Sequence, residues 1–512
     1  MLWLALHLPQ LSLEAFCATL DAELRQRPVA LIAEHRVRHV NRAAAERGIK
    51  PGAKRATALA LAADLLAAEA DAARDAAALR AVAYAALVFT PAVCEHDEQT
   101  VLMEVASSLR LFGGLAALLK RLREVLIPLH HRVRVAAAPT ALGAALLAQW
   151  GPRERGCLVL GPHATQLRAL QDLLDEAPVW LLGRGREHWE ALQGMGLRQL
   201  SDLRALPRSG LARRFGADLL GDLDRAVGAQ ADPRRSLSLP AQFESRLELF
   251  SRAENTDQVL HGAAVLLARL VAWAQARQAR VGGFTLRMLH ERQRRAEVEP
   301  TELHVELAEP ALDPAHLQLL LRERLARVTL AAPTLELQLQ CRHLVAAPAP
   351  NAELFATRAS EAEGLTRLLE RLRARLGDGQ VTRLLPVADY RPERASRVVP
   401  ATGGGGLPAA AVVAALAAAQ ASSLPLHRPA WLLPEPVPLA EADEDAMPLL
   451  DGRPLLLLSG PERIESGWWD GDTVARDYFI AQADDGSLVW IYHGRLGTPR
   501  GEPNWYLQGR FA

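Results

Sequence analysis

Residues 94–114 read CEHDEQTVLMEVASSLRLFGG, and this stretch decides the fold of the N-terminal part of the chain. Residues 100–105 are rich in β-forming side chains and alternate in character, which is typical of a buried strand. Ser107 and Ser108 break that pattern, and the following LRLFGG leads into a helical run over residues 115–126. The stretch therefore predicts a buried strand, a loop and a helix in direct succession.

A second strand is predicted at the N-terminus, over residues 1–8. Four leucines, at positions 2, 4, 6 and 8, alternate there with Trp3, Ala5 and His7. This period of two is typical of a half-buried strand. The segment PQLSLE, residues 9–14, follows it and predicts a direct passage from the strand into a helix.

Together these segments resemble the palm of the Y-family, or lesion-bypass, DNA polymerases. In that family one strand carries an Asp-Glu pair, then two apolar residues, Leu and Asp, before a loop and a helix. Aligned on residues 103–105 (MEV), that pair falls on Gln99 and Thr100. The first catalytic Asp of the family falls on Ala5, in the N-terminal strand. Glu104 is the acid that remains.

The resemblance implies that the metal-binding carboxylates have been lost. Phosphoryl transfer by two metal ions needs carboxylates that hold Mg²⁺ against the triphosphate and the attacking 3′-oxygen. Ala5, Gln99 and Thr100 cannot supply them, and Glu104 alone cannot hold two divalent ions. We therefore expect no catalytic residue, no metal site and no cofactor. The chain reads as a pseudo-polymerase, similar to the ImuB family of bacterial mutagenesis proteins.

The nucleotide grip is altered as well. Residues 40–52 (VNRAAAERGIKPG) resemble the fingers motif of the Y-family, in which a Tyr and an Arg hold the incoming triphosphate. Here these positions fall on Arg42 and Ala45. Arg42 keeps a positive charge, whereas Ala45 removes a phosphate donor.

One alternative leaves the chain an active enzyme. Asp97 and Glu98 are themselves an Asp-Glu pair, two residues before the positions assigned above. Sliding the strand register by two residues would keep every side chain on the same face, so this pair could be catalytic. In that case the chain would be a divergent but active Y-family DNA polymerase. The slide would misplace residues 103–105 and would still leave Ala5 without a carboxylate.

The resemblance continues domain by domain. The predicted fold class is multidomain α/β and α+β, with Y-family polymerase-like palm, fingers, thumb and little finger and a small mainly-β C-terminal module. The order β-α-β-β-α-β, expected after the helical thumb, is that of the little finger. The C-terminal module holds four of the ten tryptophans. The predicted boundaries are 1–165 for the palm with a fingers insertion at about 25–87, 166–233 for the thumb, 240–345 for the little finger, 346–445 for a Pro/Ala/Gly-rich linker and 446–512 for the β module.

Charge favours DNA as a partner only locally. The chain carries 59 basic and 59 acidic residues, so no overall field attracts nucleic acid. Residues 25–55, however, hold nine Lys or Arg against two acids, and residues 266–298 hold seven Arg against two acids. Backbone N–H groups at a Gly-x-Gly turn can also approach a phosphate closely. The DNA-binding candidates are Gly183, Arg184, Gly185 and Arg186 in the thumb, and Arg287, Arg292, Arg294 and Arg295 in the little finger.

A short segment beyond the little finger predicts contact with a sliding clamp. Residues 351–355 read NAELF and resemble the bacterial clamp-binding pattern Gln-x-x-Leu-Phe. Asn351 keeps the amide, and Leu354 and Phe355 keep the two apolar anchors, whose burial should supply most of the affinity. A competing match, RLELF at residues 246–250, alternates like a little-finger strand, so its anchors should be buried.

The family resemblance also implies partners and a location. It implies a scaffold of mutagenic translesion synthesis in the DNA-damage (SOS) response, which joins an error-prone DnaE-type polymerase, the β sliding clamp and a RecA-like accessory protein of the ImuA type. The four cysteines lie far apart without paired spacing, which argues against a zinc or disulfide framework and fits a reducing cytoplasm. No run approaches 18 uninterrupted apolar residues, so no membrane span is expected. We expect a cytoplasmic, nucleoid-associated protein.

Overall fold

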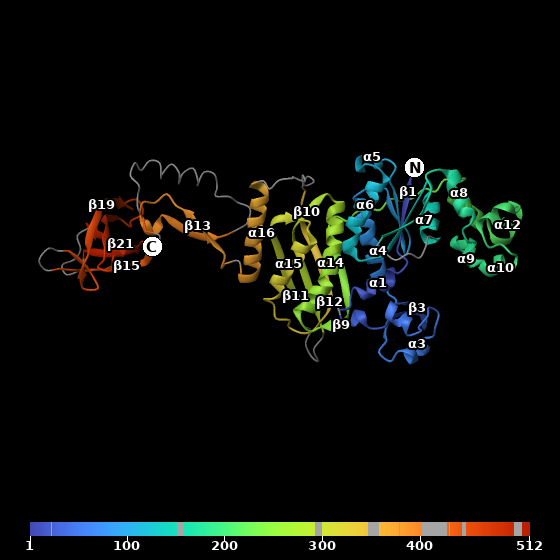
Figure 1. Cartoon of the computed structure of the whole chain (residues 1–512), viewed down its shortest axis with the longest axis horizontal. Helices are drawn as coiled ribbons and strands as arrows, with labels where there is room; N and C mark the ends of the chain where they lie inside the picture. Colours follow the sequence, from blue (N-terminus) through green and yellow to red (C-terminus); the bar gives the residue numbers. More distant parts are fainter. Residues whose placement is uncertain are drawn as a thin grey trace. The chain divides into compact units, whose positions relative to one another are not determined.

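The computed structural model divides into two compact units, Met1–Glu363 and Gly364–Ala512, which we describe separately (Figure 1). The structure describes residues 1–21, 23–150, 158–291, 299–346, 358–377, 379–401, 428–429, 431–442, 447–495 and 504–511. The predicted fold class, a multidomain Y-family-like architecture with a C-terminal β module, is confirmed.

The palm-like sheet has five strands in the order β5-β6-β1-β7-β8. Its central strand β1 is antiparallel to both neighbours, β6 and β7. The strand predicted over residues 100–105 is β6. The bounds are β1 Trp3–His7, β5 Val93–Asp97, β6 Thr100–Glu104, β7 Val133–Ala138 and β8 Leu158–His163.

Helices cover both faces of this sheet, with α7 on one side and α4 and α6 on the other (Figure 1). The bounds are α1 Leu11–Cys17, α4 Ala72–Leu87, α5 Leu109–Phe112, α6 Leu115–Leu126 and α7 Ala141–Trp150. Helix α7 reads ALGAALLAQW and is buried along eight consecutive residues, because it packs between the sheet and the thumb-like helices. A helix that is apolar all round belongs in such a place.

The fingers-like insertion forms its own small domain. Its sheet has the order β3-β2-β4, and its core includes Ala30, Val37, Ala44 and Ile49. The bounds are β2 Val29–Ala33, β3 Arg36–Val40, α2 Arg42–Glu46, α3 Arg55–Leu61 and β4 Leu66–Glu69. The thumb-like part is helical, with α8 Leu167–Asp175, η3 Val179–Leu181, α9 Gly183–Glu187, α10 Trp189–Gly194, α11 Leu200–Ala205, α12 Arg208–Phe215 and α13 Ala217–Val227.

The little-finger-like part has the predicted order β-α-β-β-α-β. Its four antiparallel strands lie in the order β11-β10-β12-β9. The bounds are β9 Phe243–Ala253, α14 Thr256–Ala276, β10 Ala279–His290, β11 Thr301–Ala311, α15 Pro314–Leu325 and β12 Thr334–Ala346. Among the described residues α14 alone is long and apolar enough to cross a membrane, and 72% of its apolar window is buried, as in the core helix of a globular domain.

The second unit contains an antiparallel sheet in the order β15-β22-β21-β20-β19. Trp490 and Trp505 belong to its core, and Trp490 stacks on Tyr478 with ring centroids 4.2 Å apart. Trp468 and Trp469 are instead exposed. The bounds are β15 Trp431–Pro438, β19 Leu456–Ser466, β20 Val474–Gln482, β21 Leu488–Gly494 and β22 Trp505–Arg510, beside a small sheet of β16 Ala440–Glu441, β17 Pro448–Leu450 and β18 Arg453–Pro454.

Part of the segment predicted as a linker is folded into this unit. After α16 (Arg358–Leu376), strands β13 (Thr382–Pro386) and β14 (Ser396–Pro400) form a hairpin. Arg391, between these strands, is 1% exposed and donates hydrogen bonds to Asp389, Asp470 and the Asp472 carbonyl. The hairpin connection is therefore tied to the turn between β19 and β20, about 80 residues later. Sequence spacing gave no sign of this pairing.

Candidate functional site

A row of polar side chains crosses the palm-like sheet where β1 ends. Asp97 of β5 lies opposite Thr100 of β6, Thr100 opposite His7 of β1, and His7 opposite Arg134 of β7. The Nδ1 atom of His7 and the Oγ1 atom of Thr100 share a hydrogen bond of 3.0 Å. Directly opposed residues face the same side of a sheet, so these four residues form one row across that face, which we call the polar row. His7 and Thr100 within it are buried.

The C-terminal end of α7 ties the two ends of the polar row together. Gln149 Nε2 donates to Asp97 Oδ2 at 3.1 Å, and Arg134 Nη1 donates to the Gln149 carbonyl at 3.4 Å. Asp97 also accepts the backbone N–H of Gln99 at 2.8 Å. The one carboxylate of the row is thus already hydrogen-bonded, and an arginine lies in the same row.

Strand register places His7, rather than Ala5, beside Thr100. Ala5 lies opposite Leu102 and Ala136 and is fully buried in the core beneath α7. The alignment of motifs predicted that Ala5 lies beside Gln99 and Thr100. In the structure His7 occupies that place, and Ala5 lies two residues away along β1. The two choices differ by two residues, which preserves the side-chain face, so alternation along the strand could not distinguish them. The available signal was a single imidazole in an otherwise apolar strand.

His7 is a neutral imidazole at neutral pH. Burial lowers its pKa to about 4; nearby Asp97 acts in the opposite direction, and Arg134 lowers it further. A neutral imidazole can bind a metal ion, but a stable site needs further ligands around it. No group of three His, Cys, Asp or Glu side chains that could hold a metal ion exists within the described ranges. Around His7, the polar row itself offers one carboxylate, that of Asp97.

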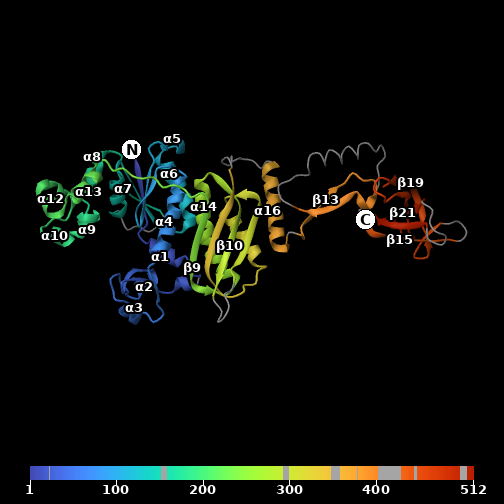
Figure 2. The same cartoon turned by 180° about the vertical axis from the view of Figure 1, so that it is seen from behind.

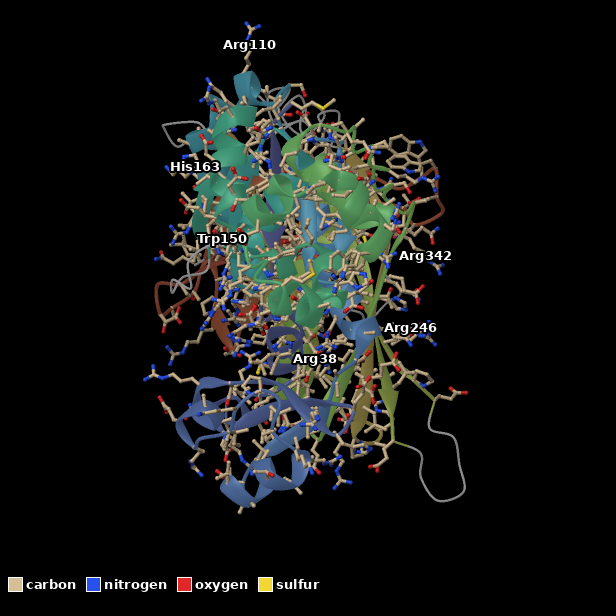
Figure 3. The ribbon with its side chains drawn as sticks, turned by 90° about the vertical axis from the view of Figure 1, so that its right-hand side faces the viewer. Arg38, Arg110, Trp150, His163, Arg246 and Arg342 are labelled. Carbon is tan, nitrogen blue, oxygen red and sulfur yellow. The ribbon has the colours of Figure 1, made fainter. Side chains whose placement is uncertain are left out.

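The alternative pair, Asp97 and Glu98, occupies two different surroundings. Asp97 ends β5 and is held by the hydrogen bonds given above. Glu98 lies in the turn between β5 and β6, with its side chain 88% exposed and 3.9 Å from Arg38 of the fingers-like domain. Figure 3 shows Arg38 where the fingers-like domain meets the palm.

Glu104 has a structural environment at the other end of β6. Its Oε1 atom accepts the backbone N–H groups of Leu2 at 3.0 Å and Ala106 at 3.1 Å. Four residues of strand, about 13 Å, separate it from Thr100. Glu104 therefore fastens the N-terminus and the loop after β6, and it is too far from the polar row to share a metal ion with it.

The altered nucleotide grip lies on α2 of the fingers-like domain. The Asn41 side chain caps this helix by accepting the Ala44 N–H at 2.9 Å. Arg42 is exposed and pairs with Glu46 at 2.7 Å, and Ala45 is exposed one position before that glutamate. An exposed ion pair of this kind is weak, so the Arg42 guanidinium remains able to bind another anion.

The two glycines of the thumb-like Gly-x-Gly have different roles. A Cβ atom at Gly185 would lie 2.1 Å from the Val179 carbonyl oxygen, so the close packing of α9 on η3 requires glycine there. Gly183 has no heavy atom within 4 Å of its Cβ position, so its backbone is open to an approaching ligand. Arg184 pairs with Glu187 at 2.8 Å, and Arg186 lies over the Trp180 ring at 5.7 Å.

Of the little-finger candidates, the structure describes Arg287. Its Nε atom lies 2.8 Å from Glu302, so its charge is partly balanced within the sheet. Arg292, Arg294 and Arg295 lie outside the described residues. Figure 3 shows two further arginines, Arg246 and Arg342, projecting from the same sheet.

The clamp-binding candidates Asn351, Leu354 and Phe355 also lie outside the described residues. The competing match is described, within β9. There Leu249 is buried, and the Phe250 ring packs edge-on against Phe16 with centroids 5.1 Å apart. The expectation that both anchors are buried holds for Leu249 and is wrong for Phe250, whose side chain is 41% exposed. A clamp could take up both anchors only by disrupting the strand, because Leu249 is buried.

Comparisons with known proteins agree with this architecture. Residues 12–149 match the impB/mucB/samB family. Protein ImuB of Caulobacter vibrioides strain NA1000 / CB15N is 31% identical over 486 residues, which cover 91% of this chain and 100% of that protein. The chain belongs to the ImuB family. Protein ImuB of strain ATCC 19089 / CIP 103742 / CB 15 matches this ImuB-family chain with the same identity and coverage.

Solved structures similar to this ImuB-family chain include a ternary complex of Dbh and a crystal structure of DinB. A Dbh ternary complex covers 67% of the chain and 99% of its own length, with a TM-score of 0.39 and 15% identity. DinB from Sulfolobus solfataricus covers the same shares, with a TM-score of 0.37 and 16% identity.

Proposed function

We propose that this chain is a non-catalytic, DNA-binding scaffold of a mutagenic translesion-synthesis complex. The observation that carries the proposal is the polar row: the place where the β1 and β6 strands meet holds His7, Thr100, Arg134 and one carboxylate, Asp97. Phosphoryl transfer depends on metal ions that neutralise the charge developing on the phosphate. The polar row offers one carboxylate, which is already hydrogen-bonded, and an arginine lies in the same row. We infer that it does not hold the metal ions that would neutralise this charge.

The surroundings of the row support the same proposal. The position two residues before His7 is Ala5, and it is filled by the packing of α7 against the sheet. Metal ions and a triphosphate need a polar, accessible pocket, whereas the surroundings of Ala5 are a buried core rich in alanine and leucine. We expect the palm to serve as a structural scaffold that holds the other domains.

We propose that the thumb-like and fingers-like domains, which have polar surfaces, bind DNA. Gly183 leaves the start of α9 open, and the first N–H groups of a helix have no partner within it. Arg184 and Arg186 flank that opening, and the fingers-like domain carries nine basic residues between positions 25 and 55. We propose weakly sequence-specific binding that depends on phosphate contacts.

The protein partners are proposed from the family and from residues 351–355. We propose that Asn351, Leu354 and Phe355 bind the β sliding clamp, because the competing anchors Leu249 and Phe250 are held within β9. The further proposed partners are an error-prone DnaE-type polymerase and a RecA-like accessory protein of the ImuA type.

The test pairs two measurements on the same purified chain. Fluorescence anisotropy with a labelled primer–template should show binding, while primer extension with Mg²⁺ or Mn²⁺ and all four nucleotides should show none. Extension by the chain would instead support the alternative, a divergent active polymerase. Absence of both activities would remove the DNA-binding part of the proposal.

A further inference from the structure

A large cleft lies inside the first unit, between the little-finger-like sheet and the palm- and fingers-like domains. Its volume is 1170 Å³, larger than the roughly 300–1,000 Å³ of most small-molecule sites. One wall follows nine consecutive residues, 242–250, which span about 30 Å of extended chain. The opposite wall is formed by β4 and α4. Figures 1 and 2 both show β9 on the side of its sheet that faces α1 and the fingers-like domain.

Two unpaired strand edges line this cleft. β9 is the last strand of the order β11-β10-β12-β9, and β4 is the last of β3-β2-β4. In the part of the chain that the structure describes, β9 pairs only with β12, and β4 only with β2. An edge strand presents alternating free N–H and C=O groups, which are a template for a further strand. A small molecule or a helix cannot match that pattern along its length.

A buried arginine on the cleft wall lacks an acidic partner. Arg269 of α14 is 5% exposed, and burial lowers its pKa to about 10. Its Nη1 atom donates to Ser245 Oγ at 3.2 Å and to the Arg246 carbonyl at 3.4 Å. No carboxylate forms an ion pair with it within the described ranges. A buried cation normally has an anionic partner or several strongly polar ones. Both partners of Arg269 are neutral, and a backbone carbonyl of an incoming strand would add a further acceptor.

The side chains around the cleft define the chemistry of its occupant. Ala73, Ala77 and Ala81 lie on one face of α4 and leave space for larger apolar side chains. We call the residues of β9 and β12 on the sheet face away from α14 the outer row. In it, the carboxylates of Glu244, Glu248 and Glu336 outnumber the guanidinium of Arg246, whereas Arg74 and Arg80 of α4 line the opposite wall. A strand beside β9 would alternate its side chains between these two surfaces.

We propose that an extended segment of a partner protein binds in this cleft as a fifth strand, added to β9. Its apolar side chains would face the alanines of α4, and its basic side chains would face the glutamates. A nucleic-acid strand is the less suitable occupant, because the outer row is acidic and phosphate carries no donors to match the carbonyls of β9. This inference is independent of the proposed function of the palm.

The test uses the full chain and a defined probe. The probe is a fluorescein-labelled peptide of about seven residues that alternates valine and lysine; a peptide of the same composition in scrambled order keeps its charge but not its alternation. We expect the alternating peptide to bind by anisotropy and to slow hydrogen exchange of β9 amides, including those of Glu244, Arg246 and Glu248. The scrambled peptide should do neither.

A pair of substitutions on one helix locates the site. Ala77→Trp fills the cleft and should weaken peptide binding by about tenfold or more. Ala76→Trp, at the neighbouring position outside the cleft, should leave binding unchanged. Circular dichroism melts of both variants check folding. If Ala77→Trp does not fold, the exchange measurement on the unsubstituted chain decides alone.

Three results would overturn the inference. The first is equal binding of the alternating and scrambled peptides, which would indicate charge attraction only. The second is binding without protection of the β9 amides. The third is protection of the same amides by a single-stranded oligothymidylate instead of the peptide, which would make the cleft a path for nucleic acid.

Discussion

His7 is the central residue of the polar row in the palm-like sheet. It is buried, it shares a hydrogen bond with Thr100, and it lies in the same row as Asp97 and Arg134. Burial opposes the charged form of an imidazole, so the side chain stays neutral where an ordinary histidine would begin to gain a proton. A neutral, sheltered imidazole is compatible with packing, and it adds no negative charge beside Asp97.

Titration of His7 follows from this environment. Its pKa is about 4 in the folded chain, against 6.5 for an ordinary solvated histidine, so the unfolded chain takes up the proton first as pH falls. This contribution to the free energy of unfolding is complete above pH 6.5 and decreases by about 3 kcal/mol as pH falls to 4. NMR of labelled histidines, assigned with His7→Gln, should show no titration of His7 above pH 5. A midpoint near 6.5 would contradict the buried position.

At the scale of elements, the limits of sequence reasoning are clear. Alternation in residues 100–105 predicts β6, and the helix–strand succession predicts the little-finger-like order, because both depend on local pattern. The position of His7 rather than Ala5 beside Thr100 depends on pairing between strands that are distant in the sequence. A shift of the strand register by two residues leaves the alternation of side chains unchanged, so alternation cannot detect it. The contact between Arg391 and Asp470 likewise joins residues 79 apart in a way that spacing does not encode.

The Arg391 contacts predict a local stability effect. Arg391→Met would leave the carboxylates of Asp389 and Asp470 without their shared cation and should lower the unfolding midpoint of the second unit. Arg394→Met is the matched control, because Arg394 meets Asp470 at a half-exposed position. Limited proteolysis across a urea series, read at residues 382–400, measures both. Equal effects of the two substitutions would show that burial of Arg391 contributes nothing.

The segment at residues 351–355 predicts clamp binding. Leu354→Ala/Phe355→Ala should abolish binding to a bacterial β sliding clamp, because it removes both apolar anchors. Glu353→Ala changes a position that the pattern leaves free and should keep the affinity. Surface plasmon resonance with immobilised clamp separates the two outcomes. Unchanged affinity of the double variant would refute the assignment and direct attention to β9.

At the scale of the whole molecule, the proposed DNA binding requires local basic surfaces, because the chain carries no net charge. Reversing Arg292, Arg294 and Arg295 to Glu should weaken DNA binding and flatten its salt dependence by about one unit of slope per lost phosphate contact. Arg453→Glu, in the second unit, changes charge away from this run and serves as control. Anisotropy titrations at several salt concentrations give both quantities. Affinity that is insensitive to the triple reversal would show that the run is only a solvated surface.

Primer extension tests the central proposal most directly. The purified chain is incubated with a primer–template, four nucleotides and Mg²⁺ or Mn²⁺, beside His7→Gln and Asp97→Asn preparations purified in the same way. The polar row predicts no extension by the chain above that of these variants, because a neutral imidazole and a hydrogen-bonded carboxylate cannot hold the metal ions of phosphoryl transfer. Template-directed extension that is present in the unsubstituted chain and lost in Asp97→Asn would contradict it.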